Sequence, residues 1–184
     1  MEGPLERELI EQARRGDRAA YEQIVRRKVE TVYRTARAIL GNDADADDAT
    51  QEALIGAWRR IGSLRDADRF DAWLGRITVN ACRMALRRRR GPALVTLGGS
   101  DSGHELAESQ RPGFEHRAVT ADAFDRAFDR LPLEQRAILV LHHRDELPVA
   151  EVAARLGIPE GTAKSRLHAA RAALDRSLAR EGLR

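Results

Sequence analysis

Residues 147–174, LPVAEVAARLGIPEGTAKSRLHAARAAL, predict two short helices joined by a tight turn. Gly157 lies in the turn, and Pro159 immediately precedes the second helix, a common place for proline. One face of the second helix is small and apolar, whereas the rest is polar and basic. This layout is that of a helix-turn-helix, in which the second helix lies in the major groove of DNA.

The second helix has one face suited to burial and another suited to DNA. Its predicted buried stripe is Ala163, Leu167, Ala170 and Leu174. Small residues opposite this stripe allow close approach to DNA, and flanking cations can reach phosphates or base edges. The candidate DNA contacts are Thr162, Lys164, Ser165, Arg166, His168 and Arg171. For His168, the alternative is an exposed side chain without a role in binding.

The remaining sequence also predicts helices. Alanine and leucine dominate the apolar residues, aromatic residues make up only 4%, and no stretch alternates as a strand does. We expect helices over about residues 5–15, 17–40, 45–61, 70–90, 121–130 and 133–143. The apolar run of the second of these comprises Tyr21, Ile24, Val25, Val29, Val32, Tyr33, Ala36, Ile39 and Leu40. The chain is therefore predicted to be all-α.

A segment of different composition divides the chain into two small helical domains. Residues 91–112, GPALVTLGGSDSGHELAESQRP, are rich in glycine, serine and proline without helical periodicity. We predict a flexible linker over residues 91–118, between a domain of residues 1–90 and a domain of residues 119–184. Fully extended, a linker of this length reaches roughly 100 Å, so the domains can occupy separate sites on DNA.

The predicted helix of residues 70–90 carries two stripes. Its core stripe is Phe70, Trp73, Ile77, Ala81 and Met84, and its polar stripe is Arg76, Asn80, Arg83 and Arg87. Planar guanidinium groups suit phosphates and guanine edges, so the polar stripe is a second candidate DNA surface. The alternative is a solvated basic face near a helix C-terminus.

The helix before it is acidic. Asp43, Asp45, Asp47, Asp48 and Glu52 crowd its start, and no basic residue occurs between Gly41 and Trp58. Acidic residues stabilise a helix N-terminus, but only within the first turn. Because phosphate would repel this face, a basic protein partner is the better explanation.

Composition excludes several classes of protein. A single cysteine, Cys82, forms no internal disulfide, and no apolar leader begins the chain, so we expect a cytoplasmic protein. No run approaches the roughly 20 apolar residues that span a bilayer, so no membrane insertion is expected. Cys82 itself lies near the core stripe and is expected to be a small buried side chain.

Sites for catalysis, cofactors and metals are also not expected. The sequence contains no nucleophile with an adjacent base, no phosphate-binding loop and no zinc-hydrolase motif, which argues against an enzyme. His142 and His143 lie beside Asp145 and Glu146, but there is no matched ligand pair elsewhere. We therefore predict no catalytic residue, no cofactor and no metal.

Taken together, these segments resemble an RNA polymerase sigma factor of the extracytoplasmic-function (ECF) group, which has two helical domains. DADDATQEALIGAWRRI is similar to the polymerase-binding helix of that family, and FDAWLGRITVNACRMALRRRR to its promoter-melting helix. LPLEQRAILVLHHRDELPVAEVAARLGIPEGTAKSRLHAARAAL is similar to its second DNA-binding domain. Both blocks occur in the family's order, over nearly the whole chain.

The resemblance implies roles for these residues. The residues implied to dock on the clamp helices of the largest polymerase subunit are Asp48, Gln51, Glu52 and Trp58. Those implied for the minus-ten element are Arg65 and Arg69 in a base-capturing loop, Asn80 beside them, and Arg76, Arg83 and Arg87 on the DNA backbone. The C-terminal domain would read the minus-thirty-five element and meet the flap of the second-largest subunit.

Regulation is also implied by the resemblance. An anti-sigma factor is the expected regulator, and a membrane-anchored one would hold the chain at the membrane. Two other functions compete with this interpretation. A stand-alone regulator would use the same helix-turn-helix, usually as a dimer, and a helical adaptor would bind only proteins. The adaptor leaves two basic faces unexplained.

Overall fold

The computed structural model describes residues 4–90 and 117–183, and within these ranges it contains helices and turns but no strand. Its α-helices are α1 (Pro4–Arg14), α2 (Arg18–Leu40), α3 (Asp43–Arg60), α4 (Phe70–Arg90), α5 (Arg117–Asp129), α6 (Leu133–Leu139), α7 (Val149–Leu156) and α8 (Glu160–Arg180). Two 3-10 turns, η1 (Ile61–Ser63) and η2 (Ala67–Arg69), precede α4, and a π-helical turn, η3 (Val140–Arg144), follows α6. The predicted all-α fold is confirmed. Residues 91–116 of the predicted linker lie outside the described residues, and its last two residues, 117 and 118, belong to α5 instead, so the predicted boundary is two residues too late.

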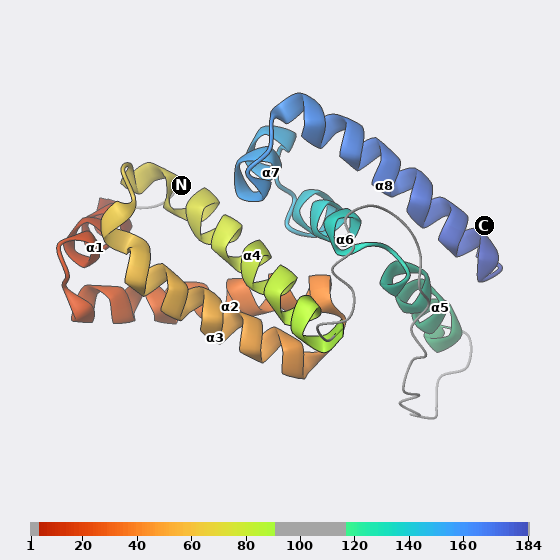
Figure 1. Cartoon of the computed structure of the whole chain (residues 1–184), viewed down its shortest axis with the longest axis horizontal. Coiled ribbons are helices and arrows are strands. Elements are labelled where there is room, and N and C mark those ends of the chain that lie inside the picture. The colour runs from red at the N-terminus through yellow and green to blue at the C-terminus, as the bar shows by residue number, and fades with distance from the viewer. Residues whose placement is uncertain (1–3, 91–116, 184) are drawn as a thin grey trace.

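Local capping sets the ends of α2 and α3. Asp17 caps α2 by accepting a hydrogen bond from the backbone N–H of Ala20 at 3.1 Å. Gly41 ends α2 at a φ of 83°, a left-handed conformation that glycine adopts without strain. Asn42 then caps α3, which therefore begins slightly before its predicted start. The tight connection makes α2 and α3 antiparallel, and α4 packs against both (Figure 1).

The buried face of α4 differs from its predicted core stripe. Phe70, Ile77 and Ala81 are buried as predicted, but Met84 is 49% exposed. A stripe that advances in steps of seven residues drifts by about 20° per step around a straight helix. The drift carries Met84 out of the interface, and the core continues through Ala85 instead.

In the C-terminal half, α7 and α8 form the predicted helix-turn-helix. Gly157 ends α7 at a φ of 68°, which turns the chain sharply toward α8. Ala163, Leu167 and Ala170 are buried where α8 packs on α6 and α7. The predicted stripe of α8 is confirmed, and the opposite face of this helix is open to solvent.

The two halves lie against each other (Figure 1). α4 packs on α7, while α2 meets α6 and η3. α5 and α8 form the outer side of the C-terminal half, away from α3. In the described part of the chain, no helix has the length and apolar character needed to cross a membrane.

Candidate functional site

α3 presents most of the residues predicted to bind polymerase. Asp48, Gln51 and Glu52 are exposed on this helix. Glu52 is ion-paired with Arg88 near the C-terminal end of α4, and Arg89 pairs with Asp45 at 3.3 Å. The arginine run that ends α4 therefore neutralises part of the acidic helix, and Asp48 and Gln51 remain exposed beside it.

Trp58 has a different environment from the other predicted polymerase contacts. It is partly buried against Tyr21 of α2, with 5.0 Å between ring centroids and 41° between the ring planes. The Tyr21 hydroxyl donates a hydrogen bond to the carbonyl of Leu54 at 2.6 Å, and burial raises the pKa of Tyr21 to about 12. Trp58 and Tyr21 thus fix the spacing between α2 and α3.

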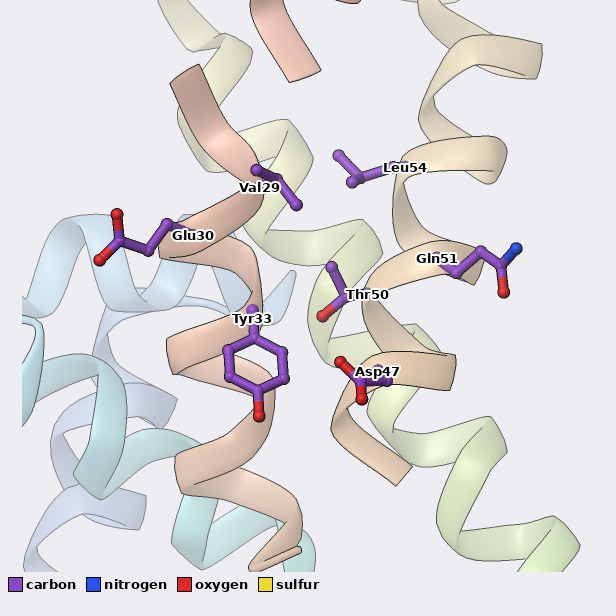
Figure 2. A pocket seen from close by; sticks show the side chains of 7 residues that line it. All are labelled: Val29, Glu30, Tyr33, Asp47, Thr50, Gln51 and Leu54. Carbon is purple, nitrogen blue, oxygen red and sulfur yellow. The ribbon is translucent and has the colours of Figure 1, made fainter. Parts of the chain in front are cut away.

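Between α2 and α3 lies an open groove of about 490 Å³ (Figure 2). Its walls are formed by Val29, Glu30, Tyr33, Asp47, Thr50, Gln51 and Leu54. Apolar side chains form most of its surface, and Val29 is 37% exposed although the sequence predicted it within the apolar stripe of α2. Asp47 places its carboxylate on the α3 side of the groove, whereas the carboxylate of Glu30 on α2 points away from α3 (Figure 2).

Thr50 gives the groove an unpaired polar group. Its side chain is 6% exposed, and its hydroxyl oxygen has no hydrogen-bond partner in the described part of the chain. Figure 2 shows this side chain on the groove-facing side of α3. Because a buried hydroxyl without a partner is unfavourable, a polar group that reached it through a change of the Thr50 rotamer would be stabilised here. From the sequence, Gln51 was predicted to bind polymerase and Asp47 was placed in the acidic stretch, whereas Val29 and Tyr33 were predicted only as apolar residues of a helix. Glu30, Thr50 and Leu54 were not predicted to take part in a site.

The predicted base-capturing loop comprises η1, η2 and the residues between them. Leu64 and Ala67 are buried and anchor the loop, while Arg65 and Arg69 are exposed. Asn80 lies between two and three helical turns after Phe70, the first residue of α4, which corresponds to a rise of about 15 Å along the helix axis. The loop and Asn80 therefore lie at separate points along one surface.

Part of the predicted minus-ten surface on α4 is engaged by the C-terminal half. Arg83 forms a two-pronged ion pair with Glu134 of α6, from Nε to Oε1 at 2.7 Å and from Nη2 to Oε2 at 2.8 Å. This hydrogen bonding lowers the pKa of Glu134. A third donor of Arg83, Nη1, bonds the side-chain oxygen of Asn80 at 2.5 Å. The guanidinium of Arg83 therefore donates hydrogen bonds to both Glu134 and Asn80. Arg87, one turn further along α4, is exposed.

Close helix packing also brings α7 over α4. A β-carbon at Gly75 would lie 2.6 Å from the side chain of Arg155, and one at Gly157 would lie 2.9 Å from the guanidinium of Arg76. The two glycines therefore permit a close approach between the helices. Arg76, predicted to bind DNA, lies against the turn of the helix-turn-helix.

The predicted minus-thirty-five residues lie on the open side of α8. Lys164, Ser165, Arg166, His168 and Arg171 are exposed, and Thr162 is partly buried. Lys164 pairs with Glu160 at 2.8 Å, and Arg171 donates from Nε to Nε2 of His143 at 3.0 Å. α8 thus brings all six residues to one side of the helix-turn-helix.

Two other predicted residues lie in the core or near it. Cys82 is fully buried, as predicted, and burial raises the pKa of its thiol to about 12. His142 bonds the carbonyl of Leu147 through Nδ1 at 2.9 Å. In the ranges that the structure covers, no group of three or more His, Cys, Asp or Glu side chains is placed to hold a metal.

Comparison with known proteins defines the class of this two-part helical chain. Residues 24–91 match the Sigma-70 region 2 family, and residues 121–174 match the Sigma-70, region 4 family. The ECF RNA polymerase sigma factor SigM of Mycobacterium tuberculosis is 39% identical over 163 residues, which cover 89% of this chain and 79% of SigM. SigW of Bacillus subtilis, also an ECF sigma factor, is 30% identical over 92% of this chain and 94% of SigW.

A solved structure shows the same architecture. CnrH, in complex with the cytosolic domain of CnrY, superposes with a TM-score of 0.66 at 27% identity, over 95% of this chain and 97% of that one. The chain belongs to the ECF RNA polymerase sigma factors. It therefore binds core RNA polymerase and directs promoter-specific transcription initiation.

Proposed function

We propose that the groove between α2 and α3, together with the exposed acidic face of α3, binds the clamp helices of the largest polymerase subunit. The observation that supports this proposal is the groove itself, which combines a largely apolar surface, the carboxylate of Asp47 and the unpaired hydroxyl of Thr50. A helix that carries an apolar side chain between basic ones matches this chemistry. Asp48, Gln51 and Glu52 flank the groove on α3, while Trp58 acts by holding α2 and α3 together.

We further propose that the two DNA-binding surfaces divide the promoter between them. The minus-ten element is assigned to Arg65, Arg69, Arg76, Asn80, Arg83 and Arg87, within a domain of residues 1–90. The minus-thirty-five element is assigned to the open face of α8, within a domain of residues 119–184 that also meets the flap of the second-largest subunit. Residues 91–118 connect the two domains. The chain itself carries out no catalysis.

An anti-sigma factor is the proposed regulator, acting in the cytoplasm. Its support is the similarity to CnrH, which was solved with the cytosolic domain of CnrY bound. An anti-sigma factor anchored in the membrane would hold this chain there and keep it from polymerase.

Run-off transcription tests the promoter assignment. Core RNA polymerase, with and without this protein, transcribes a library of genomic fragments, and the transcript starts are sequenced. We expect new starts that share two upstream motifs at a fixed spacing. If tight, salt-sensitive DNA binding produces no new starts, the stand-alone regulator is the better explanation.

A matched pair of variants tests the groove. Val29→Asp places a charge on the groove wall, while Leu5→Asp changes an exposed apolar residue on α1 that is not a groove residue. The chain is labelled with a fluorescent dye and titrated with core polymerase. We expect Val29→Asp to weaken this binding by tenfold or more, on the order of the 1–3 kcal/mol that burying a polar group costs. Leu5→Asp should bind as the wild type does. Equal affinity of both variants for polymerase would contradict the groove assignment.

A further inference from the structure

Arg171 on the open face of α8 is held by a residue from another segment. Its Nε donates a hydrogen bond to Nε2 of His143, at 3.0 Å, across 28 positions of sequence. His143 belongs to η3, the π-helical turn after α6. Both side chains are exposed, so the pair lies at the surface where α8 would meet DNA.

The imidazole of His143 is itself supported. His142 packs against it edge to face, with 4.8 Å between ring centroids and 67° between the rings. His142 is anchored in turn by the bond from its Nδ1 to the carbonyl of Leu147, at 2.9 Å. Val140 and Leu141 are buried and fix the turn in the core. A π-helical turn places the residues that follow it differently from an α-helix, and such turns are frequent at functional sites.

The geometry defines the protonation state of His143. The guanidinium of arginine can only donate, so Nε2 of His143 must accept, and the proton of a neutral imidazole is on Nδ1. Burial, followed by the charges of Arg171 and His142, lowers the pKa of His143 and favours this neutral form. Several charged residues on the segments packed around η3 are ion-paired: Arg144 with Asp145, Arg155 with Glu151, Arg83 with Glu134, and Arg136 with Asp129. Asp145 also accepts a hydrogen bond from the hydroxyl of Thr35, and Glu146 of the adjoining turn and Arg166 of α8 are exposed.

We propose that His143 is a positioning residue for promoter recognition, which holds the guanidinium of Arg171 in the orientation that contacts the minus-thirty-five element. The inference rests on the proposed function of α8. An arginine has five N–H donors, and the bond to His143 uses only the one on Nε. The two terminal amino groups remain free to bind a phosphate or the O6 and N7 of a guanine. Fixing the side chain beforehand reduces the entropy lost on binding.

A double-mutant cycle tests this proposal in the holoenzyme. Core polymerase with the full chain binds a fluorescent duplex carrying a promoter found by run-off transcription. The variants are Arg171→Ala, His143→Ala, both together, and His143→Gln, whose side-chain oxygen can still accept a hydrogen bond. We expect His143→Ala to weaken binding by about threefold to tenfold, the range for one hydrogen bond. His143→Gln should restore the affinity, and the double variant should bind no more weakly than Arg171→Ala alone.

The pH profile provides a readout that a structural role of His143 would not change. The reference is His143→Gln, which keeps His142 and His168 and so accounts for the other histidines near Arg171. Protonated His143 cannot accept from Arg171 and repels it, so affinity should fall as the pH drops from about 7.5 to about 5, through the lowered pKa. The fall in affinity over this range should be smaller for His143→Gln than for the wild type, and equal profiles would contradict the proposal.

The outcomes separate this inference from the proposed function. If Arg171→Ala weakens binding but His143→Ala does not, positioning by His143 is wrong and the DNA contact stands. If Arg171→Ala binds as the wild type does, the proposed contact fails and the inference fails with it. Additive losses in the double variant, with unchanged melting temperatures, would show that His143 acts without Arg171 and would overturn the inference.

Discussion

At the scale of single residues, Thr50 carries a buried hydroxyl in the groove between α2 and α3, without a hydrogen-bond partner among the residues described. Leaving such a group unpaired costs about 1–3 kcal/mol. A residue that stabilised only the free protein would be apolar at this position, so we interpret the hydroxyl as a group that serves a bound partner.

Thr50→Val tests this interpretation, because valine replaces the hydroxyl with a methyl group of similar shape. We expect the free protein to become more stable by about 1 kcal/mol and its affinity for core polymerase to fall severalfold. Urea denaturation gives the stability, and titration with core polymerase gives the affinity.

Thr78→Val is the matched control. Thr78 is equally buried, but its hydroxyl donates to the carbonyl of Leu74 at 3.0 Å. This substitution should leave stability unchanged or lower it, with no effect on polymerase binding. If Thr50→Val binds polymerase as tightly as the wild type, the hydroxyl does not contact the partner.

At the scale of elements, the turn between α7 and α8 depends on its glycine. Gly157 has a φ of 68°, and a β-carbon there would also meet the guanidinium of Arg76. Gly157→Ala should therefore lower the free energy of unfolding by roughly 1–2 kcal/mol. Gly161→Ala, in open space on the first turn of α8, should instead raise it by up to about 1 kcal/mol. Opposite shifts in urea midpoint are expected, and shifts of the same sign would contradict the role of the left-handed turn.

The boundaries of these elements were largely predictable, since their signals are local. Asp17 and Gly41 limit α2 by capping, and α4 occupies the predicted residues 70–90. α5 begins at Arg117, before its predicted start, and the end of α6 widens into η3, which the sequence did not reveal. A π-helical turn depends on how its buried residues fit the core, so periodicity alone did not identify it.

The surfaces between elements were harder to predict. Val29 has the spacing of a core residue on α2, yet it lines a groove because α3 does not cover that part of the helix. The partner of Arg83, Glu134, lies 51 residues away in sequence, beyond the reach of any helical pattern. The chemical character of each face was evident from sequence, but the partner that meets it was not.

At the scale of the whole molecule, the observed packing of the two halves engages part of the surface that we propose to bind the minus-ten element. Arg83 cannot use the same donors for both Glu134 and a DNA phosphate, and the guanidinium of Arg76, although exposed, lies beside Gly157 in the turn after α7. A second set of bonds joins Thr35 to Asp145 at 2.9 Å and Arg144 to the carbonyl of Arg34 at 2.7 Å. Full exposure of the proposed minus-ten surface therefore requires the halves to separate.

Glu134→Gln should shift this equilibrium toward separated halves. The pKa of Glu134 is lowered by Arg83, so the contact is fully formed above its ordinary pKa of about 4.3 and is lost as the pH falls through the lowered value. At neutral pH the substitution removes a charge that is present. A partly exposed ion pair contributes about 1 kcal/mol, which corresponds to about a fivefold change in the ratio of closed to open molecules.

Energy transfer between two dyes measures that ratio, with cysteines introduced by Glu22→Cys on α2 and Asp175→Cys on α8. The buried Cys82, whose thiol pKa is raised to about 12, should not react with the dyes. Glu134→Gln should lower the transfer efficiency, and added salt should lower that of the wild type toward the same value. Glu181→Gln is the control, because Glu181 pairs with Arg126 and Arg130 inside the C-terminal half. Equal efficiencies for Glu134→Gln and Glu181→Gln would mean that the pair with Arg83 does not hold the halves together.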